Sequence, residues 1–576
     1  MSGKYHAIKE SLKRFFLLCY NYVNKSKVLK LSLIFALFFI IFFSVYFSVS
    51  TLSSSDDHFF HFQFAEQMRE HGFFSSLQDF KTLYFSKMAQ GNQYFIYYNF
   101  LFYLVAIPFT YIAPLYLGIK LYAVFAITIA VVLLYWCVEK IDIKKPLLWT
   151  VIMLAISNTD SIWRFFLSRP YALAPSLLLV LLVFLYKKKY WGIFFLTIFY
   201  IYWHSATFFM PIGVVIVYCI MRRFYGVKSD YKSLIACVGG TVVAIAGTYL
   251  VSSGFILYMK EIIFGSYADT IIGKKINIAE GGELYPIDII NLVKVNGLVF
   301  MAFVSALAVD IFGYIAYKWK KITAAEYFLD LGKERKILQT TMLFLIALFF
   351  LGTVAISGRF GDYFTFFAVI YVAFSFDYVF RSLSISGSKA IKRGLASGLI
   401  VALIYIFSSN LFFLQDRLAH GARENEFYRI GTWLEMNTKP HDIVFVSNWG
   451  LFPELYYFSP ENYYTSGIEP RFLYTYNPEL YWLSIHIAQN GYVCTTEKCP
   501  DLDAQEVAAF RTNDGAEKWA KNEGDKIVDV LTQQFHSQYI VTTTSYMTFN
   551  YILNHNSHFQ DMVYDTNYGN AVYKIK

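Results

Sequence analysis

The sequence predicts an α-helical membrane protein that crosses the bilayer about eleven times and carries a soluble α/β domain at its C-terminal end. Of its 576 residues, 56% are hydrophobic and only 16% are charged, a composition too apolar for a soluble globular protein. Apolar runs close to the roughly 20 residues that a membrane span requires recur from Leu31 to about Phe413. The sequence that follows is polar and rich in Gly, Pro and Asn, so residues 414–576 are expected to fold in water.

The N-terminal segment is basic and is expected to lie in the cytoplasm, as residues 1–30. No small-residue cleavage site follows the first apolar run, so this run is predicted to be a retained span rather than a signal peptide. The transmembrane module is predicted to cover 31–413, with a long outer loop at 52–113. The eleven predicted spans are 31–51, 115–138, 146–163, 170–186, 190–203, 205–221, 233–255, 290–317, 338–356, 361–381 and 393–413.

The segment from Tyr94 to Ala113 decides the topology. It is long enough to cross the membrane, but Asn99 and Pro108 interrupt it. If it does not cross, the predicted cytoplasmic loops hold 27 Lys and Arg and the outer loops before the C-terminal domain hold 9. Because positive residues concentrate on the cytoplasmic side, we interpret the segment as an interfacial amphipathic helix. The net charge of +9 is then a topology signal and does not indicate nucleic-acid binding.

This topology predicts a multi-pass protein of the plasma (inner) membrane whose long loops and C-terminal domain face the periplasm or the cell exterior. Cys494 and Cys499 lie five residues apart in that domain. They are expected to form a small disulfide in an oxidising compartment, or to remain unlinked thiols. The sequence contains no CxxC and no His-rich zinc spacing.

The first candidate site follows the first span, where Asp56 and Asp57 open an aromatic helix that also carries His58 and His61. A carboxylate at the membrane rim can accept a proton from an acceptor group or bind a divalent metal ion. The alternative is that Ser55 or Asp56 only caps the helix. Two acids and two histidines are more than a cap requires, which favours a functional site.

The second candidate site is the next outer loop, which contains Asp160, Arg164 and Arg169, together with His204 at the outer end of a later span. Ionisable groups at membrane depth are costly and tend to line cavities or substrate paths. The alternatives are that the two arginines extend to lipid headgroups and that His204 is a packing residue.

The third candidate site is the turn before the tenth span, where Arg359 stands between two glycines and is followed by Asp362. A guanidinium at such a turn can donate two parallel hydrogen bonds to a phosphate. A reaction that expels a lipid phosphate needs a cation of this kind. The alternative is an internal ion pair between Arg359 and Asp362.

Taken in order, these segments resemble the GT-C superfamily of membrane glycosyltransferases, and in particular the protein mannosyltransferase and aminoarabinose transferase group. The resemblance covers nearly the whole chain and rests on four short motifs and on the exposed C-terminal domain. The motifs are Asp56-Asp57, Ser168-Arg169-Pro170-Tyr171, Trp203-His204-Ser205 and Arg359-Phe360. It implies a donor in which a sugar is linked to a polyprenyl phosphate, and an acceptor that is a glycan, a lipid or a protein.

The resemblance also implies roles for individual residues. Asp57, with Asp56 beside it, matches the catalytic base or metal-contacting acid of the family, and Arg359 matches the arginine that contacts the donor phosphate. Arg169 and Arg164 are further candidates for that phosphate. No cofactor is assigned, and a divalent metal ion at Asp56 and Asp57 stays open. The WWD-type block of oligosaccharyltransferases is not found, which favours transfer of a single sugar.

The C-terminal domain is predicted to be a small α/β fold. Residues 442–447 read as a strand, Phe452 begins a helix, 527–535 has helical spacing, 538–543 is β-branched, and Ala571–Ile575 reads as a closing edge strand. Polar and aromatic residues follow the strands, as they do where open α/β sheets bind ligands, and we interpret them as an acceptor or glycan contact surface: Asn448, Trp449, Glu454, Glu469, Arg471 and Tyr474.

Two other functions compete with a glycosyltransferase. A transporter or flippase of lipid-linked glycans would use the same charges to line a path, but such proteins usually place them near the bilayer midplane between repeated halves. Here the charges lie at outer ends of spans, and no internal repeat is found. A membrane-anchored scaffold with a binding domain is the third possibility.

Overall fold

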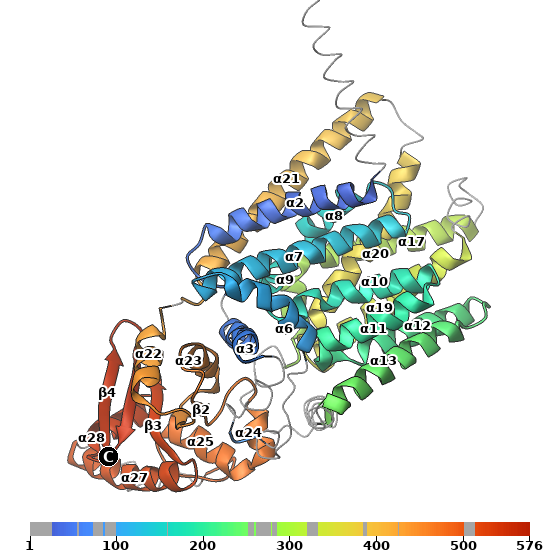
Figure 1. Cartoon of the computed structure of the whole chain (residues 1–576). Coiled ribbons are helices and arrows are strands. Elements are labelled where there is room, and N and C mark those ends of the chain that lie inside the picture. The colour runs from blue at the N-terminus through green and yellow to red at the C-terminus, as the bar shows by residue number, and fades with distance from the viewer. Residues whose placement is uncertain are drawn as a thin grey trace, which may run out of the picture.

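Long apolar helices form a bundle, and a smaller α/β domain packs beside one end of it (Figure 1). The computed structural model describes residues 26–53, 57–72, 84–86, 99–157, 159–251, 259–260, 278, 285–318, 332–383, 389–423, 425–499 and 513–576. The helix α3 (Asp57–His71) lies between the bundle and the domain. We call this end of the bundle the domain-facing end.

Six helical stretches among the described residues are long and apolar enough to cross a membrane, which makes the chain an integral membrane protein. Two further pairs of helices pass the same test but are sharply bent, by 114° in the first pair and by 93° in the second. The six stretches are α2 (Lys27–Phe47), α7 (Leu115–Lys140), η3 (Ser205–Thr207) with α12 (Met210–Phe224), α13 (Tyr231–Val251), α19 (Lys333–Ala355) and α20 (Phe360–Leu383). The bent pairs are α9 (Thr159–Phe165) with η2 (Pro170–Leu173) and α10 (Ala174–Tyr186), and α16 (Ile289–Val295) with α17 (Gly297–Lys318).

One predicted span is shorter in the structure than predicted, and another has its predicted bounds but is short for a membrane span. The span predicted at 146–163 is wrong in its length, because α8 (Pro146–Ile156) ends at a run of residues that prefer turns and helix caps, 157–160. The helix α11 (Tyr190–Trp203) is also short. The segment predicted to be interfacial contains α6 (Phe100–Ala106) and η1 (Ile107–Tyr111), which together are too short to cross. The last helix, α21 (Lys389–Ala419), continues beyond 413.

The helix α10 forms the centre of the bundle. Nearly all of its residues are buried, as expected for a helix that is apolar on every face. It packs against α7, α11, α12, α19 and α20. Because η2 and α10 follow the bend after α9, the central helix begins at the domain-facing end, where Arg169 precedes it.

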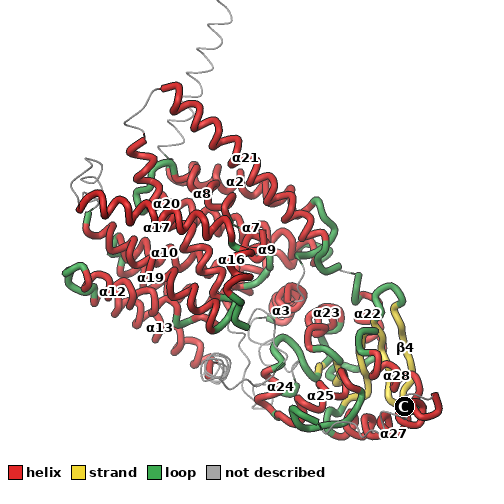
Figure 2. The backbone as a smooth tube through the Cα atoms, turned by 180° about the vertical axis from the view of Figure 1, so that it is seen from behind, coloured by secondary structure: helices red, strands yellow, loops and turns green. Residues whose placement is uncertain are grey.

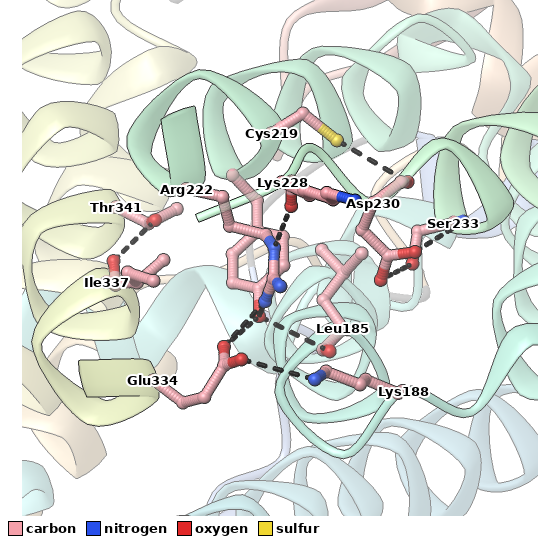
Figure 3. A network of polar contacts seen from close by, with 11 residues as sticks. Leu185, Lys188, Cys219, Arg222, Lys228, Asp230, Ser233, Glu334, Ile337 and Thr341 are labelled. Carbon is pink, nitrogen blue, oxygen red and sulfur yellow. Dashed lines mark hydrogen bonds and ion pairs between the residues drawn. The ribbon is translucent and has the colours of Figure 1, made fainter. Parts of the chain in front are cut away.

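A polar network fixes the helices at the opposite end of the bundle (Figure 3). The Glu334 carboxylate accepts Arg222 Nη1 at 2.6 Å and Lys188 Nζ at 3.2 Å, so it joins α12 and the end of α10 to the start of α19. Arg222 Nε also donates to the Lys228 carbonyl at 3.2 Å. Ser233 Oγ donates to Asp230 at 2.7 Å at the start of α13. The network holds four helices in register at the end away from α3.

The C-terminal domain contains one five-stranded sheet with the order β2-β1-β3-β5-β4, which Figure 2 shows beside the bundle. The first three strands in this order are parallel, and β5 and β4 pair antiparallel. Around the sheet lie α22, α23, α24, α25, α27 and α28. The bounds are β1 (Ile443–Val446), β2 (Tyr463–Tyr464), β3 (Ser537–Thr543), β4 (Phe559–Asp565), β5 (Asn570–Ile575), α22 (Tyr428–Asn437), α23 (Phe452–Phe458), α24 (Arg471–Tyr476), α25 (Pro478–Asn490), α27 (Asn513–Gln533) and α28 (Met547–His555).

The predicted mixed α/β domain is therefore confirmed in class, but the predicted closing edge strand is wrong in its position. The strand β5 lies between β3 and β4, and β4 forms the edge. The burial of the two strands explains the error. Most residues of β5 are buried, whereas β4 has the mixed, polar pattern that an exposed edge tolerates.

Candidate functional site

The first candidate acid stands at the start of α3. The helix begins at Asp57, and His58 to Ala65 are all buried. Asp56 lies outside the described residues, as do Ser54 and Ser55, so the predicted cap and the second acid are not placed. The side chain of Asp57 remains 30% exposed, and it is therefore an accessible acid at the start of the buried stretch of α3.

Two candidate arginines flank the 114° bend between α9 and α10. Arg164 is the penultimate residue of α9, and Arg169 directly precedes η2. Arg169 Nη2 lies 3.1 Å from Asp57 Oδ2, and its side chain is 18% exposed. The bend therefore brings a cation from the second outer loop onto the acid of the first, and joins two of the segments that the sequence singled out.

His58 fixes the position of this pair. The backbone N–H of Ser168 donates to His58 Nδ1 at 3.0 Å, so the ring proton is on Nε2, which lies 3.0 Å from Ser53 Oγ. Ser53 Oγ in turn donates to the Phe166 carbonyl at 2.9 Å. Since His58 follows Asp57 and Ser168 precedes Arg169, these bonds hold the two chain segments together beside the ion pair.

The two buried histidines of α3, His58 and His61, are neutral. Burial, followed by the positive charge of Arg169, lowers the pKa of His61 to about 3. Burial also holds the pKa of His58 well below its usual range, with smaller contributions from Arg169 and His61. His61 Nδ1 lies 2.7 Å from the Tyr103 hydroxyl. The two neutral rings, His58 and His61, therefore act as hydrogen-bonding groups near Asp57.

A second ion pair lies next to the first. Arg164 Nε is 2.9 Å from Asp362 Oδ2, and the Asp362 side chain is only 9% exposed. The Arg164 guanidinium also lies over the ring of Tyr171, 5.2 Å from its centroid. Asp362 is therefore held by a cation from α9, and an ion pair with Arg359 stays an open alternative.

His204 lies within reach of the charge of Arg359. His204 Nδ1 lies 2.7 Å from Thr207 Oγ1, which is 2.8 Å from the Tyr200 hydroxyl. Burial, followed by the charge of Arg359, lowers the pKa of His204 to about 3. The rings of His204 and Tyr363 both contact Tyr171 at about 6.3–6.4 Å between centroids. The predicted third site is therefore beside the second.

Asp160 occupies a different environment. Its carboxylate is 2.6 Å from Arg417 Nη1, near the end of α21, and both side chains are more than 40% exposed. The Arg417 guanidinium also covers the ring of Trp163, 4.4 Å from its centroid. This arrangement is a surface ion pair that links α9 to α21.

The C-terminal domain packs directly on the helix that carries Asp57. Phe60 of α3 contacts Tyr456 and Phe452 of α23, with centroids 5.4 and 5.7 Å apart. Phe59 contacts Tyr457 at 5.0 Å. Because Phe452 follows shortly after the carboxyl end of β1, this end of the sheet lies close to α3 (Figure 1).

Two apolar cavities lie on either side of α20. One, of about 30 Å³, lies between α7, α8, α9 and α20, and Asp362 is one of its few polar lining residues. The other, an open pocket of about 450 Å³, lies between α17, α19 and α20, and half of its lining residues are phenylalanines: Phe300, Phe303, Phe344, Phe350 and Phe364.

Asp57 does not belong to any group of three or more metal-ligating side chains among the described residues. The group that its carboxylate contacts is the Arg169 cation, which competes with a metal ion for the same oxygens. Asp56, the second acid of the predicted pair, lies outside the described residues, so a metal ion at Asp56 and Asp57 stays a prediction, and no step below is assigned to one.

Comparison with solved structures identifies the fold. The oligosaccharyltransferase of Archaeoglobus fulgidus aligns with a TM-score of 0.56 at 10% identity, over 95% of this chain and 74% of that one. ArnT from Cupriavidus metallidurans, bound to undecaprenyl phosphate, aligns with a TM-score of 0.54 at 11% identity, over 95% and 98% of the two chains. The chain has the GT-C fold. No family model and no curated protein matches the sequence.

In this GT-C fold Asp57, Asp362 and the candidate arginines gather at the domain-facing end, whereas Asp160 lies in a surface ion pair. Sequence reasoning assigned no role to Ser53, Ser168 or Tyr103, which hold the two α3 histidines. It also missed Arg417, which engages Asp160. In the sequence, Ser53 and Ser168 are marked only by their proximity to a candidate residue. Arg417 and Tyr103 have no such signal.

Proposed function

We propose that the chain is an integral-membrane glycosyltransferase that moves a sugar from a polyprenyl-phosphate carrier to an acceptor, with inversion at the anomeric carbon. The observation that carries this proposal is the Asp57–Arg169 ion pair, a partly exposed acid and cation joined at the bend of a GT-C fold. Two solved neighbours support the substrate classes, since ArnT holds undecaprenyl phosphate and a second structure of the oligosaccharyltransferase is tethered to an acceptor peptide.

Asp57 is assigned the role of base. In a single displacement the acceptor hydroxyl or amide attacks the anomeric carbon, its proton passes to a carboxylate oxygen of Asp57, and the bond from that carbon to the phosphate oxygen breaks. Arg169 contacts Asp57 Oδ2 and so orients the carboxylate, leaving Oδ1 as the oxygen that faces the acceptor. His58 supports this geometry through Ser168.

Arg359 is assigned to the leaving phosphate. A phosphate that departs with its electron pair gains negative charge, and a positioned guanidinium stabilises that charge. Arg164 and Arg169 each hold a carboxylate, but a guanidinium has five N–H donors, so both are assigned as secondary contacts to the same phosphate. Their proximity across the bend makes this end of the bundle a cationic site.

The phenylalanine-lined cavity is assigned to the polyprenyl chain. It is almost wholly apolar, and Phe364 on its wall follows Arg359 by little more than one helical turn. A phosphate at Arg359 would therefore leave its hydrocarbon chain beside α17 and α19. The acceptor would approach from the side of α3 and α23, where the C-terminal domain packs.

The distribution of positive charge supports an outer location for the site. The network around Glu334 belongs to loops rich in Lys and Arg at the opposite end of the bundle, and such loops favour the cytoplasm. The domain-facing end would then lie on the periplasmic or extracellular side of the plasma (inner) membrane.

The deciding experiment measures release of free carrier phosphate by the purified protein in nanodiscs, supplied with a panel of radiolabelled polyprenyl-phosphate sugars and candidate acceptors. Asp57→Asn should abolish release while leaving insertion intact. Glu70→Gln is the matched control, because Glu70 is an exposed acid at the other end of the same helix. It should retain full release.

The other outcomes distinguish the competing functions. Binding of a lipid-linked sugar by both wild type and Asp57→Asn, without release by either, would favour a transporter or flippase. Release that is equal in Asp57→Asn and Glu70→Gln would remove Asp57 from the mechanism.

A further inference from the structure

Three metal-ligating side chains meet in the C-terminal domain, on elements that the proposed reaction does not use. His486 lies in α25, and Cys494 and Cys499 lie in the loop that follows. The possible ligand atoms of the three residues all lie within 4.8 Å of one another, and this is the one such group among the described parts of the chain. The two cysteines form a disulfide in the structure.

The His486 ring is held in a fixed orientation. It stacks on Trp482 and Tyr492, with both centroid distances at 5.8 Å and interplanar angles of 26° and 12°. Asn490 Nδ2 lies 3.0 Å from Nδ1, and Nε2 lies 2.9 Å from the Thr496 carbonyl. Thr496 is between the two cysteines in the sequence, so the ring points at the disulfide loop.

The spacing of these groups suits a thiophilic cation. Zn²⁺ binds Cys sulfur at about 2.3 Å and His nitrogen at about 2.0–2.1 Å, so ligand atoms of a tetrahedral zinc site are separated by about 3.5 Å. The three donors need to move by only about 1 Å to reach this arrangement once the sulfur atoms are no longer bonded to each other. All three belong to one helix end and its adjoining loop, so no distant element has to rearrange.

We propose that reduction of the Cys494–Cys499 disulfide converts this corner of the domain into a binding site for Zn²⁺ or a similar thiophilic divalent cation. A dithiol reductant supplies two electrons and two protons, the S–S bond breaks, two thiols form, and the dithiol becomes a disulfide. The cation then displaces both thiol protons and binds the two thiolates and His486 Nε2. Water fills the fourth position.

Asn490 is suited to support the ligated histidine. When Nε2 binds the cation, the ring proton moves to Nδ1, which then needs an acceptor. The Asn490 side chain already lies 3.0 Å from Nδ1, and rotation of its amide presents the oxygen instead of the nitrogen. The Thr496 carbonyl loses a donor, but Thr496 is exposed and water replaces it.

The site therefore has two states. The oxidised protein holds the loop closed by a covalent bond, and the reduced protein holds it closed by a metal ion. This inference does not depend on the proposed glycosyltransferase activity, because none of its ligands belongs to α3, α20 or the bend before α10.

The test uses the full chain in detergent, reduced with a phosphine because dithiols themselves bind zinc. After incubation with Zn²⁺ and removal of free metal, the reduced wild type should retain one more zinc ion per chain than the oxidised protein. Co²⁺ in place of Zn²⁺ should give a thiolate-to-cobalt charge-transfer band in the reduced protein only.

Three variants make the result specific. Cys494→Ser/Cys499→Ser should lose the extra zinc ion and the cobalt band, although it keeps the chain's other cysteines. His486→Gln should weaken zinc binding by about tenfold or more. Even the loss of a group that only hydrogen-bonds to a metal ligand lowers metal affinity by about 10–100-fold. His558→Gln, an exposed histidine of the same domain, should match wild type.

The proposal is overturned if the reduced wild type retains no more zinc than the double cysteine variant. It is equally overturned if His486→Gln binds zinc as tightly as His558→Gln. Thermal unfolding of each variant without added reductant checks that the domain remains folded.

Discussion

The backbone N–H of Ser168 donates a hydrogen bond of 3.0 Å to His58 Nδ1, one residue away from each member of the Asp57–Arg169 ion pair. Through this bond a buried histidine on α3 sets the position of the loop that precedes the central helix. The candidate base and its arginine partner are therefore held by a neutral polar contact as well as by their own charges.

Substitution of His58 by alanine should reduce both stability and transfer. It leaves the Ser168 N–H without its buried acceptor, which costs about 1–3 kcal/mol, and removes the donor to Ser53 Oγ, which keeps its bond to the Phe166 carbonyl. It also frees Arg169 from its position beside Asp57. Thermal unfolding in detergent and carrier-phosphate release would both fall. His71→Ala, at the exposed end of α3, is the control. Equal behaviour of the two variants would contradict the positioning role.

Stability should decrease as the pH falls below about 6.5. His58 and His61 stay neutral in the folded protein because burial lowers their pKa values, whereas in the unfolded chain a histidine takes up a proton near pH 6.5. The unfolded state then binds more protons, so the free energy of unfolding drops by on the order of 1 kcal/mol per histidine for each pH unit. His61→Phe should flatten the decline between pH 6.5 and 4.5, measured as the change in Tm. An unchanged slope would show that other groups cause it.

The two ion pairs of α9 should contribute different amounts to the free energy of unfolding. Asp362→Ala leaves the Arg164 charge without its carboxylate in a mostly buried position, and the loss is about 3 kcal/mol or more. Asp160→Ala breaks an exposed pair and should cost at most about 1 kcal/mol. Unfolding of both variants in the same detergent gives the comparison.

A combined variant tests the cause of the larger loss. Arg164→Met/Asp362→Leu removes both charges from the buried site and should recover part of the stability lost in Asp362→Ala. A double variant that is less stable than Asp362→Ala would mean that Arg164 acts through its contact with Tyr171 instead.

Arg359→Ala should impair use of the donor more than use of the acceptor, because its guanidinium is assigned to the lipid phosphate. The expected result is a rise in KM for the polyprenyl-phosphate sugar together with a fall in kcat, since the charge on the phosphate grows as it departs. Arg359→Lys should recover part of the rate, because a lysine keeps the charge but not the paired donors. An equal loss for both substrates would indicate a role in folding.

Phe60→Ala should loosen the C-terminal domain from the bundle. The Phe60 ring of α3 is fully buried against α23. Its removal lowers the free energy of unfolding by about 3–5 kcal/mol. Proteolysis between α21 and α22 should become faster than in wild type. Tyr111→Ala, an exposed aromatic residue of η1, serves as control, and equal cleavage rates would argue against the contact.

The sequence by itself determined the class of the protein and the location of its main elements. Apolar runs and alternating patterns are local properties, so the helices from α2 to α21 and the strands β1 and β3 could be predicted from composition and period. The candidate acids and arginines were visible for the same reason, because charged groups stand out in an apolar chain.

Only the tertiary structure decided which of these groups meet. Three arginines and three acids of similar chemistry offered many pairings, and the 114° bend before α10 selected Asp57 with Arg169 and Asp362 with Arg164, while α21 brought Arg417 to Asp160. The edge position of β4 also depends on packing. Contacts of this kind arise from the geometry of elements far apart in the chain, and local sequence carries no record of that geometry.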